Sequence, residues 1–129
     1  MKNLFRQLGW FVVVGCAAAA THWITAVACI ALLGVRPFLA NFIGWCVAVL
    51  VSFSGHYFLT FRHQEKTLLP AMRRFVTISA GGFAINELAF VYLLRLTRIP
   101  YYWLLAMILV AIAALTFVFS RHWAFRHKA

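Results

Sequence analysis

The chain has 129 residues, of which 65% are hydrophobic and 11% charged, and its mean hydropathy is +0.90. A water-soluble domain of this length could not bury so much apolar surface. The net charge of +10 comes from basic residues that flank apolar segments, a pattern typical of proteins that contact anionic lipid headgroups. No aromatic-basic platform lies in a polar segment, so we expect membrane lipids as partners and no nucleic acid.

Four apolar stretches follow one another along the chain, at about residues 8–34, 38–61, 75–96 and 100–120. Each is long enough to cross a hydrocarbon core of about 30 Å as a helix. The first and third connections are short, whereas the second, residues 62–74, is polar and carries Pro70 near the start of the next helix. We therefore predict an all-α, polytopic membrane protein in which residues 1–129 form a single domain of four transmembrane helices.

The basic residues are unequally divided between the two sides of this arrangement, nine against three. The richer side holds Lys2, Arg6, Arg62, Lys66, Arg73, Arg74, Arg121, Arg126 and Lys128, and the other holds Arg36, Arg95 and Arg98. Because positively charged flanks are preferentially retained in the cytoplasm, both termini and the central loop are expected to be cytoplasmic.

A shift of 64 residues superposes the second half of the chain on the first. Residues 61–63 then coincide with 125–127 (Phe-Arg-His in both), and His22 coincides with Asn86. The chain is thus interpreted as a duplicated hairpin, with repeat 1 at about 5–63 and repeat 2 at about 69–127. Two spans per unit would make the hairpins parallel repeats about an axis along the membrane normal.

Small residues line one face of the second predicted helix at four-residue spacing: Ala40, Gly44, Ala48 and Ser52, followed by His56. Gly15 and Ala18 form a similar face before His22. Such faces let helices approach closely, either inside the bundle or between subunits. Since four helices make a thin bundle, we expect a homo-oligomer that uses one of these two faces.

Glu87 is the only carboxylate inside a predicted span. Insertion of an ionised carboxylate at mid-membrane costs about 2.5 to 3.5 kcal/mol of free energy. Such a residue therefore usually has a hydrogen-bonding or charged partner, or a functional role. With its neighbour Asn86 and the repeat mate His22, it is a candidate for a polar path or a proton-coupling group. The alternative is a hydrogen bond between helices, which is also open for His22. For Asn41 and His56, nearer the ends of their helix, we expect a packing or interfacial role.

No metal-ligand spacing occurs among the histidines, and the three cysteines, all within spans, are interpreted as small buried residues. No nucleophile-base pair, paired carboxylates or nucleotide-binding loop is present. We therefore expect neither a metal nor a cofactor, and no enzymatic activity.

Arginines gather near helix ends at the cytoplasmic interface: Arg6, Arg62, Arg73, Arg74, Arg121 and Arg126. Their aromatic neighbours are Phe61, Trp123 and Phe125. Topology and an ordinary aromatic belt can account for them. However, the guanidinium group of arginine can also donate two hydrogen bonds to one phosphate. The same set of residues is therefore a candidate phosphate or lipid-headgroup site.

Three short motifs stand out along the chain. They are Arg74-Phe75 at the start of the third helix, the glycine pair at 81–82 before Asn86, and residues 120–125 (Ser-Arg-His-Trp-Ala-Phe), with residues 56–61 carrying the last motif in altered form. With these motifs the chain resembles the GtrA-like family of small four-span bacterial membrane proteins, and the resemblance covers essentially the whole length.

The resemblance implies translocation of a polyprenyl-phosphate-linked monosaccharide from the cytoplasmic to the outer leaflet of the bacterial inner membrane, for surface polysaccharide synthesis. Our hypothesis for the site is that Arg73, Arg74 and Arg121 receive the phosphate, while Asn86, Glu87 and His22 contact the sugar during its passage. Two alternatives stay open: a proton-coupled exporter of the small multidrug-resistance type, and a non-transporting accessory subunit of a membrane glycosyltransferase.

Overall fold

The computed structural model describes residues 2–60 and 68–126; within these ranges, the side chains of residues 3, 4, 60, 68, 69, 71, 75 and 116–126 are outside the description. Helix α1 spans Lys2–Leu33, α2 Pro37–Gly55, α3 Leu68–Leu96 and α4 Tyr101–Arg126. A π-helical turn, η1, continues α2 over His56–Thr60. The described chain is thus helical apart from two short turns, which confirms the all-α prediction.

The short turns form where the sequence predicts them. Gly34 adopts a left-handed conformation with a φ of 65°, which glycine reaches without steric cost, and this ends α1. Pro37 then opens α2 in the first turn, where a missing N–H costs nothing. The second turn, at 97–100, ends at Pro100, whose carbonyl accepts a 3.0 Å hydrogen bond from the Leu104 N–H.

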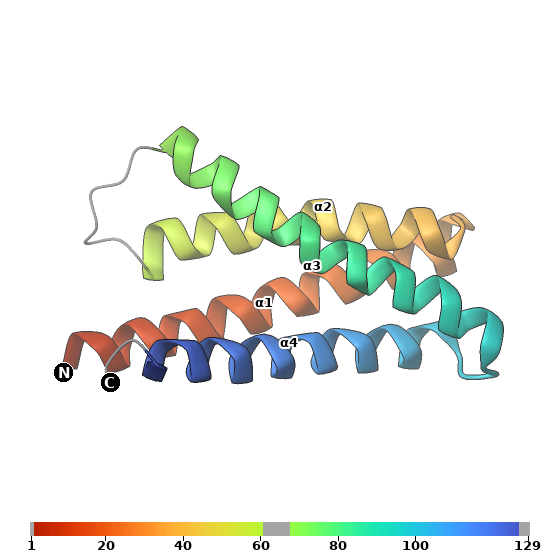
Figure 1. The fold of residues 1–129 in the computed structure, drawn as a ribbon. Helices are drawn as coiled ribbons and strands as arrows, with labels where there is room; N and C mark the ends of the chain where they lie inside the picture. The colour runs from red at the N-terminus through yellow and green to blue at the C-terminus, as the bar shows by residue number, and fades with distance from the viewer. Residues whose placement is uncertain (1, 61–67, 127–129) are drawn as a thin grey trace.

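Both turns lie at one end of the molecule, and the N-terminal end of α1 and the C-terminal end of α4 lie at the other (Figure 1). Helices α1 and α4 run side by side in this view, and α3 crosses α2 at an angle. An apolar core fills the half near the turns, built from Ala26, Phe90, Leu104, Leu105 and Ile108. The start of α3 lies away from this core (Figure 1).

The packing of α1 on α2 depends on small residues of α2. Ala40, Gly44 and Ala48 are all buried, and a Cβ at position 44 would lie only 2.7 Å from the backbone oxygen of His22. The small-residue face of α2 therefore meets α1 within the chain and is not an exposed face for a second subunit. Gly15, in contrast, has open space beside it.

Large apolar side chains cover much of the outer surface, among them Leu32, Ile78, Leu88 and Val110. Three helical stretches are long and apolar enough to cross a membrane: Phe5–Leu33, Pro37–Leu59 and Met72–Leu96. A fourth apolar stretch, Tyr101–Leu115, is shorter. An outer surface of this kind is stable against lipid chains and not against water, as expected of a multi-pass membrane protein.

The structure corrects two sequence-based boundaries. The polar connection predicted over 62–74 is shorter, because α3 already begins at Leu68. Pro70 falls in the first turn of α3, where proline is tolerated, so Arg73 and Arg74 lie within the helix and not at its start. The second predicted helix is also not uniform, since its last turn is the π-helical η1.

Candidate functional site

The described chain buries five polar side chains, namely those of His22, Asn41, His56, Asn86 and Glu87. None of them is a lysine or an arginine. Four of the five come together where α1, α2 and α3 meet, on the side of the apolar core that faces α2. The polar residues predicted from the sequence are therefore brought together, with Asn41 among them.

Asn41 joins the group through two hydrogen bonds. Its Oδ1 lies 2.6 Å from His22 Nε2, and its Nδ2 donates to Asn86 Oδ1 over 2.7 Å. Because an amide oxygen can only accept, His22 Nε2 carries the proton in the first bond. The chain of donors therefore runs in one direction, from α1 through α2 to α3.

Local sequence explains how these side chains meet. Gly44 lies about one turn after Asn41 and allows α2 to approach the His22 backbone, where any Cβ would collide. The His22 imidazole is thereby held against α2 at the level of Asn41. A packing or interfacial role was predicted for Asn41; its complete burial and its hydrogen bonds to α1 and α3 agree with packing inside the bundle.

Glu87 adjoins Asn86 on α3 and is 8% exposed. Neither of its carboxyl oxygens makes a hydrogen bond within the described part of the chain, and both are fully buried. The Asn41 side chain lies near the carboxyl but outside hydrogen-bond geometry. The next turn of α3 carries Phe90 of the apolar core, so the carboxyl is enclosed between polar and apolar groups.

An aromatic cluster on α2 and α3 adjoins this polar chain. The indole Nε1 of Trp45 donates a 2.9 Å hydrogen bond to Ser79 Oγ. The Trp45 and Phe83 rings are stacked with centroids 4.9 Å apart, and Phe42 packs edge-on against Phe83. This cluster was not predicted from the sequence, although the four-residue spacing of Asn41 with Trp45, and of Ser79 with Phe83, could have indicated it.

The fifth buried polar residue, His56, belongs to a different part of the fold. It caps α2 at the start of η1, and its ring stacks on Phe11 of α1 with centroids 4.9 Å apart. Gly55 beside it leaves room for Val14, whose Cγ1 would lie 2.6 Å from an added Cβ. His56 thus takes a packing role, which is one of the two roles predicted for it.

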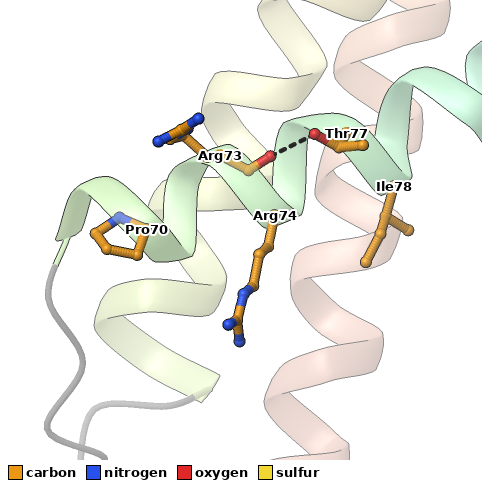
Figure 2. A pocket seen from close by; sticks show the side chains of 5 residues that line it. All are labelled: Pro70, Arg73, Arg74, Thr77 and Ile78. Carbon is orange, nitrogen blue, oxygen red and sulfur yellow. Dashed lines mark hydrogen bonds between the residues drawn. The ribbon is translucent and has the colours of Figure 1, made fainter.

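The first turns of α3 carry a groove of about 490 Å³ lined by Pro70, Arg73, Arg74, Thr77 and Ile78. Figure 2 shows the Arg73 and Arg74 side chains leaving the helix in different directions, with Arg74 and Ile78 on the same side. The Thr77 hydroxyl donates a 2.7 Å hydrogen bond to the Arg73 carbonyl. An exposed guanidinium beside an apolar wall has the chemistry to bind the phosphate of a lipid whose tail stays in the membrane, and Arg73 and Arg74 offer two such groups that point apart.

The other predicted headgroup residues are not all described. Arg6 is exposed on α1 and does not line the groove. Phe61 and Arg62 lie outside the described residues. Arg121, Trp123 and Phe125 lie on the α4 backbone, but their side chains are outside the description. Among the described residues, no group of three or more His, Cys, Asp or Glu side chains could hold a metal ion.

Comparison with known proteins identifies one family. The family model described as "GtrA/DPMS, transmembrane domain" matches residues 10–125, nearly the whole chain and every helix described above. No match was found among curated proteins or among solved structures. The chain belongs to the GtrA/DPMS transmembrane-domain family.

Proposed function

We propose that the protein translocates a polyprenyl-phosphate-linked monosaccharide from the cytoplasmic to the outer leaflet of the bacterial inner membrane, for surface polysaccharide synthesis. The family match supports a membrane protein in glycosyl-lipid-related processes. The flipping step itself, which involves no covalent chemistry, is what the resemblance to the GtrA-like family implies, and the arrangement of charged and polar groups supports it.

The observation that carries the proposal is the position of the arginine groove relative to the buried polar chain. Both include residues of α3, and Arg74 of the groove and Asn86 of the polar chain are twelve residues apart, which corresponds to about 18 Å of helix. A hydrocarbon core is about 30 Å thick. If Arg74 lies at the cytoplasmic interface, Asn86 and Glu87 lie near the middle of the membrane. A headgroup that leaves the groove would then meet hydrogen-bonding groups about halfway across the membrane.

In this proposal Arg73 and Arg74, together with Arg121 of α4, receive the phosphate. His22, Asn86 and Glu87 then contact the sugar, and the polyprenyl chain stays in lipid. The same proposal includes four spans in two parallel hairpins, cytoplasmic termini and a homo-oligomeric assembly. The even division of the chain into two hairpins, each closed by a short turn at the same end, supports this topology.

The test uses vesicles that contain the purified protein and a polyprenyl-phosphate monosaccharide in both leaflets. Membrane-impermeant periodate oxidises only sugars in the outer leaflet, so translocation exposes the remainder. We expect Arg74→Ala or Glu87→Ala to abolish this second phase, since a lost charged contact of 1.5 to 3 kcal/mol already costs at least about tenfold. Arg95→Ala, an exposed arginine in the last turn of α3, is the matched control.

Unchanged translocation in both the Arg74 and Glu87 variants would remove the site assignment. No translocation by the wild-type protein, combined with co-purification of a membrane glycosyltransferase, would overturn the proposed function in favour of an accessory subunit. Expulsion of cationic drugs without movement of the lipid would favour a multidrug exporter.

A further inference from the structure

The buried carboxyl of Glu87 poses a question that sugar contact alone does not answer. Its two oxygens are fully buried and accept no hydrogen bond within the described part of the chain. An ionised carboxylate in such a place lacks both solvent and a counter-ion, which is among the costliest arrangements a protein can contain. The arrangement is stable only if the group is neutral or if a cation accompanies it.

The groups that face Glu87 do not supply that cation. On α1 the titratable side chain of the polar cluster is His22, and its Nε2–H is engaged by Asn41. From α2 the neighbour is Asn41, an amide that does not titrate. Helix α4 contributes apolar side chains to the adjoining core, Leu104, Leu105 and Ile108. Arg95, the basic residue of α3 on the far side, is exposed two turns away.

We propose that Glu87 is a proton-binding site, which exchanges its proton for the polar headgroup of the transported lipid. This inference rests on the proposed function. With the path empty, Glu87 is a neutral carboxylic acid. When a headgroup reaches the level of Asn86, its hydroxyl groups donate hydrogen bonds to the carboxyl oxygens and stabilise the ionised form.

The exchange is balanced in atoms and charge. The carboxyl O–H bond breaks, the proton passes to water that enters with the headgroup, and the carboxylate accepts hydrogen bonds from the sugar. When the headgroup leaves, the carboxylate loses those donors and takes up one proton from the side then open. One proton therefore moves for each headgroup, and a pH difference across the membrane drives net transport.

The composition of the chain makes the protonation state directly measurable. Glu65 and Glu87 are its only acidic side chains, so in the Glu65→Gln variant Glu87 carries the one remaining side-chain carboxyl group. We expect the infrared spectrum of this variant in lipid vesicles at neutral pH to contain the C=O stretch of a protonated carboxylic acid. That band should be lost in the double variant Glu65→Gln/Glu87→Gln, because the C-terminal carboxyl is ionised at this pH. A carboxylate spectrum for Glu87, or a band that depends on sodium, would overturn the proposal.

The second measurement follows translocation in vesicles with an imposed pH difference of either sign. Wild type and Glu65→Gln should respond to the direction of the gradient, whereas Glu87→Gln should lose the response along with most of its rate. Gln has the shape of the protonated acid, so a correctly folded variant is expected. Equal wild-type rates under both gradients would overturn proton exchange and leave the proposed function standing. Conversely, failure of the wild type to translocate would overturn the function, while the infrared band would still decide whether Glu87 binds a proton.

Discussion

Asn41 Nδ2 donates a 2.7 Å hydrogen bond to Asn86 Oδ1, and the two residues are 0% and 3% exposed. This bond fixes the register of α2 against α3, because a shift by one residue would turn both amides away from each other. Asn41 also accepts from His22, so one side chain connects three helices. The polar chain is therefore a structural element as well as a candidate path.

Replacement of Asn41 by Ala should lower the stability of the protein. Both hydrogen bonds are lost and buried groups of His22 and Asn86 lose their partner. At about 0.6 to 1.7 kcal/mol for each bond within a membrane bundle, the expected loss is about 1 to 3 kcal/mol in the free energy of unfolding. Denaturant unfolding in mixed micelles measures it. Leu39→Ala, at an exposed neighbouring position, is the control, and equal stability of the two variants would contradict the assignment.

Gly44→Ala should separate α1 from α2. The added Cβ would lie 2.7 Å from the His22 backbone oxygen and 2.8 Å from its Cδ2, and the backbone atom cannot rotate away. Overpacking of this kind costs about 1 to 3 kcal/mol. Thermal unfolding in detergent should show a lower midpoint. Gly81→Ala is matched to it, because nothing lies within 4 Å of a Cβ at that position. A midpoint for Gly44→Ala as high as that of Gly81→Ala would show that the close approach is absent.

Trp45→Phe should weaken the contact between α2 and α3, since it keeps an aromatic ring against Phe83 but removes the hydrogen bond to Ser79. A double-mutant cycle with Ser79→Ala should give a coupling free energy of about 0.6 kcal/mol. Trp103→Phe, at a position that is 62% exposed, serves as the control and should show no coupling to Ser79. Additive effects of Trp45→Phe and Ser79→Ala would mean that the bond contributes nothing.

The proposed topology can be tested with single cysteines in a variant that lacks Cys16, Cys29 and Cys46. Lys2→Cys should be shielded from an impermeant maleimide added outside intact cells, and Arg98→Cys should react. Lys128→Cys, which lies outside the described residues, should behave like Lys2→Cys, because an even number of spans returns the chain to the same side. Labelling of the cysteine at 128 but not of that at 2 would require an odd number.

Much of the helical architecture follows from local sequence signals. Gly34 and Pro37 determine the first turn, and Pro100 the second, because each restricts the backbone in a way that needs no tertiary information. The four-residue spacing of Ala40, Gly44 and Ala48 likewise predicted a close helix contact, and these residues are buried. Periodicity indicates which residues share a face, and here that face meets α1.

The candidate site was only partly predictable. His22, Asn86 and Glu87 stand out because polar residues are rare in apolar segments, but their mutual distance depends on how α1 and α3 are rotated and translated relative to α2. Asn41 lies near the start of α2, so the sequence does not indicate that it hydrogen-bonds His22 and Asn86. Only the packing of α2 against α1 and α3 places it between them. The early start of α3 was missed for a local reason, because Pro70 and the pair Arg73 and Arg74 interrupt an otherwise apolar run before Phe75.

The enclosure of Glu87 as the single buried carboxyl of the described chain also has a thermodynamic consequence. Under the proton exchange proposed above, one proton per chain limits the work available in each cycle. Without a membrane potential, a pH difference of one unit supplies about 1.4 kcal/mol per proton, which supports at most about a tenfold concentration ratio of headgroup between the leaflets. Steeper accumulation would require that the lipid be consumed on the far side of the membrane, so a transporter of this design depends on the reaction that removes its product.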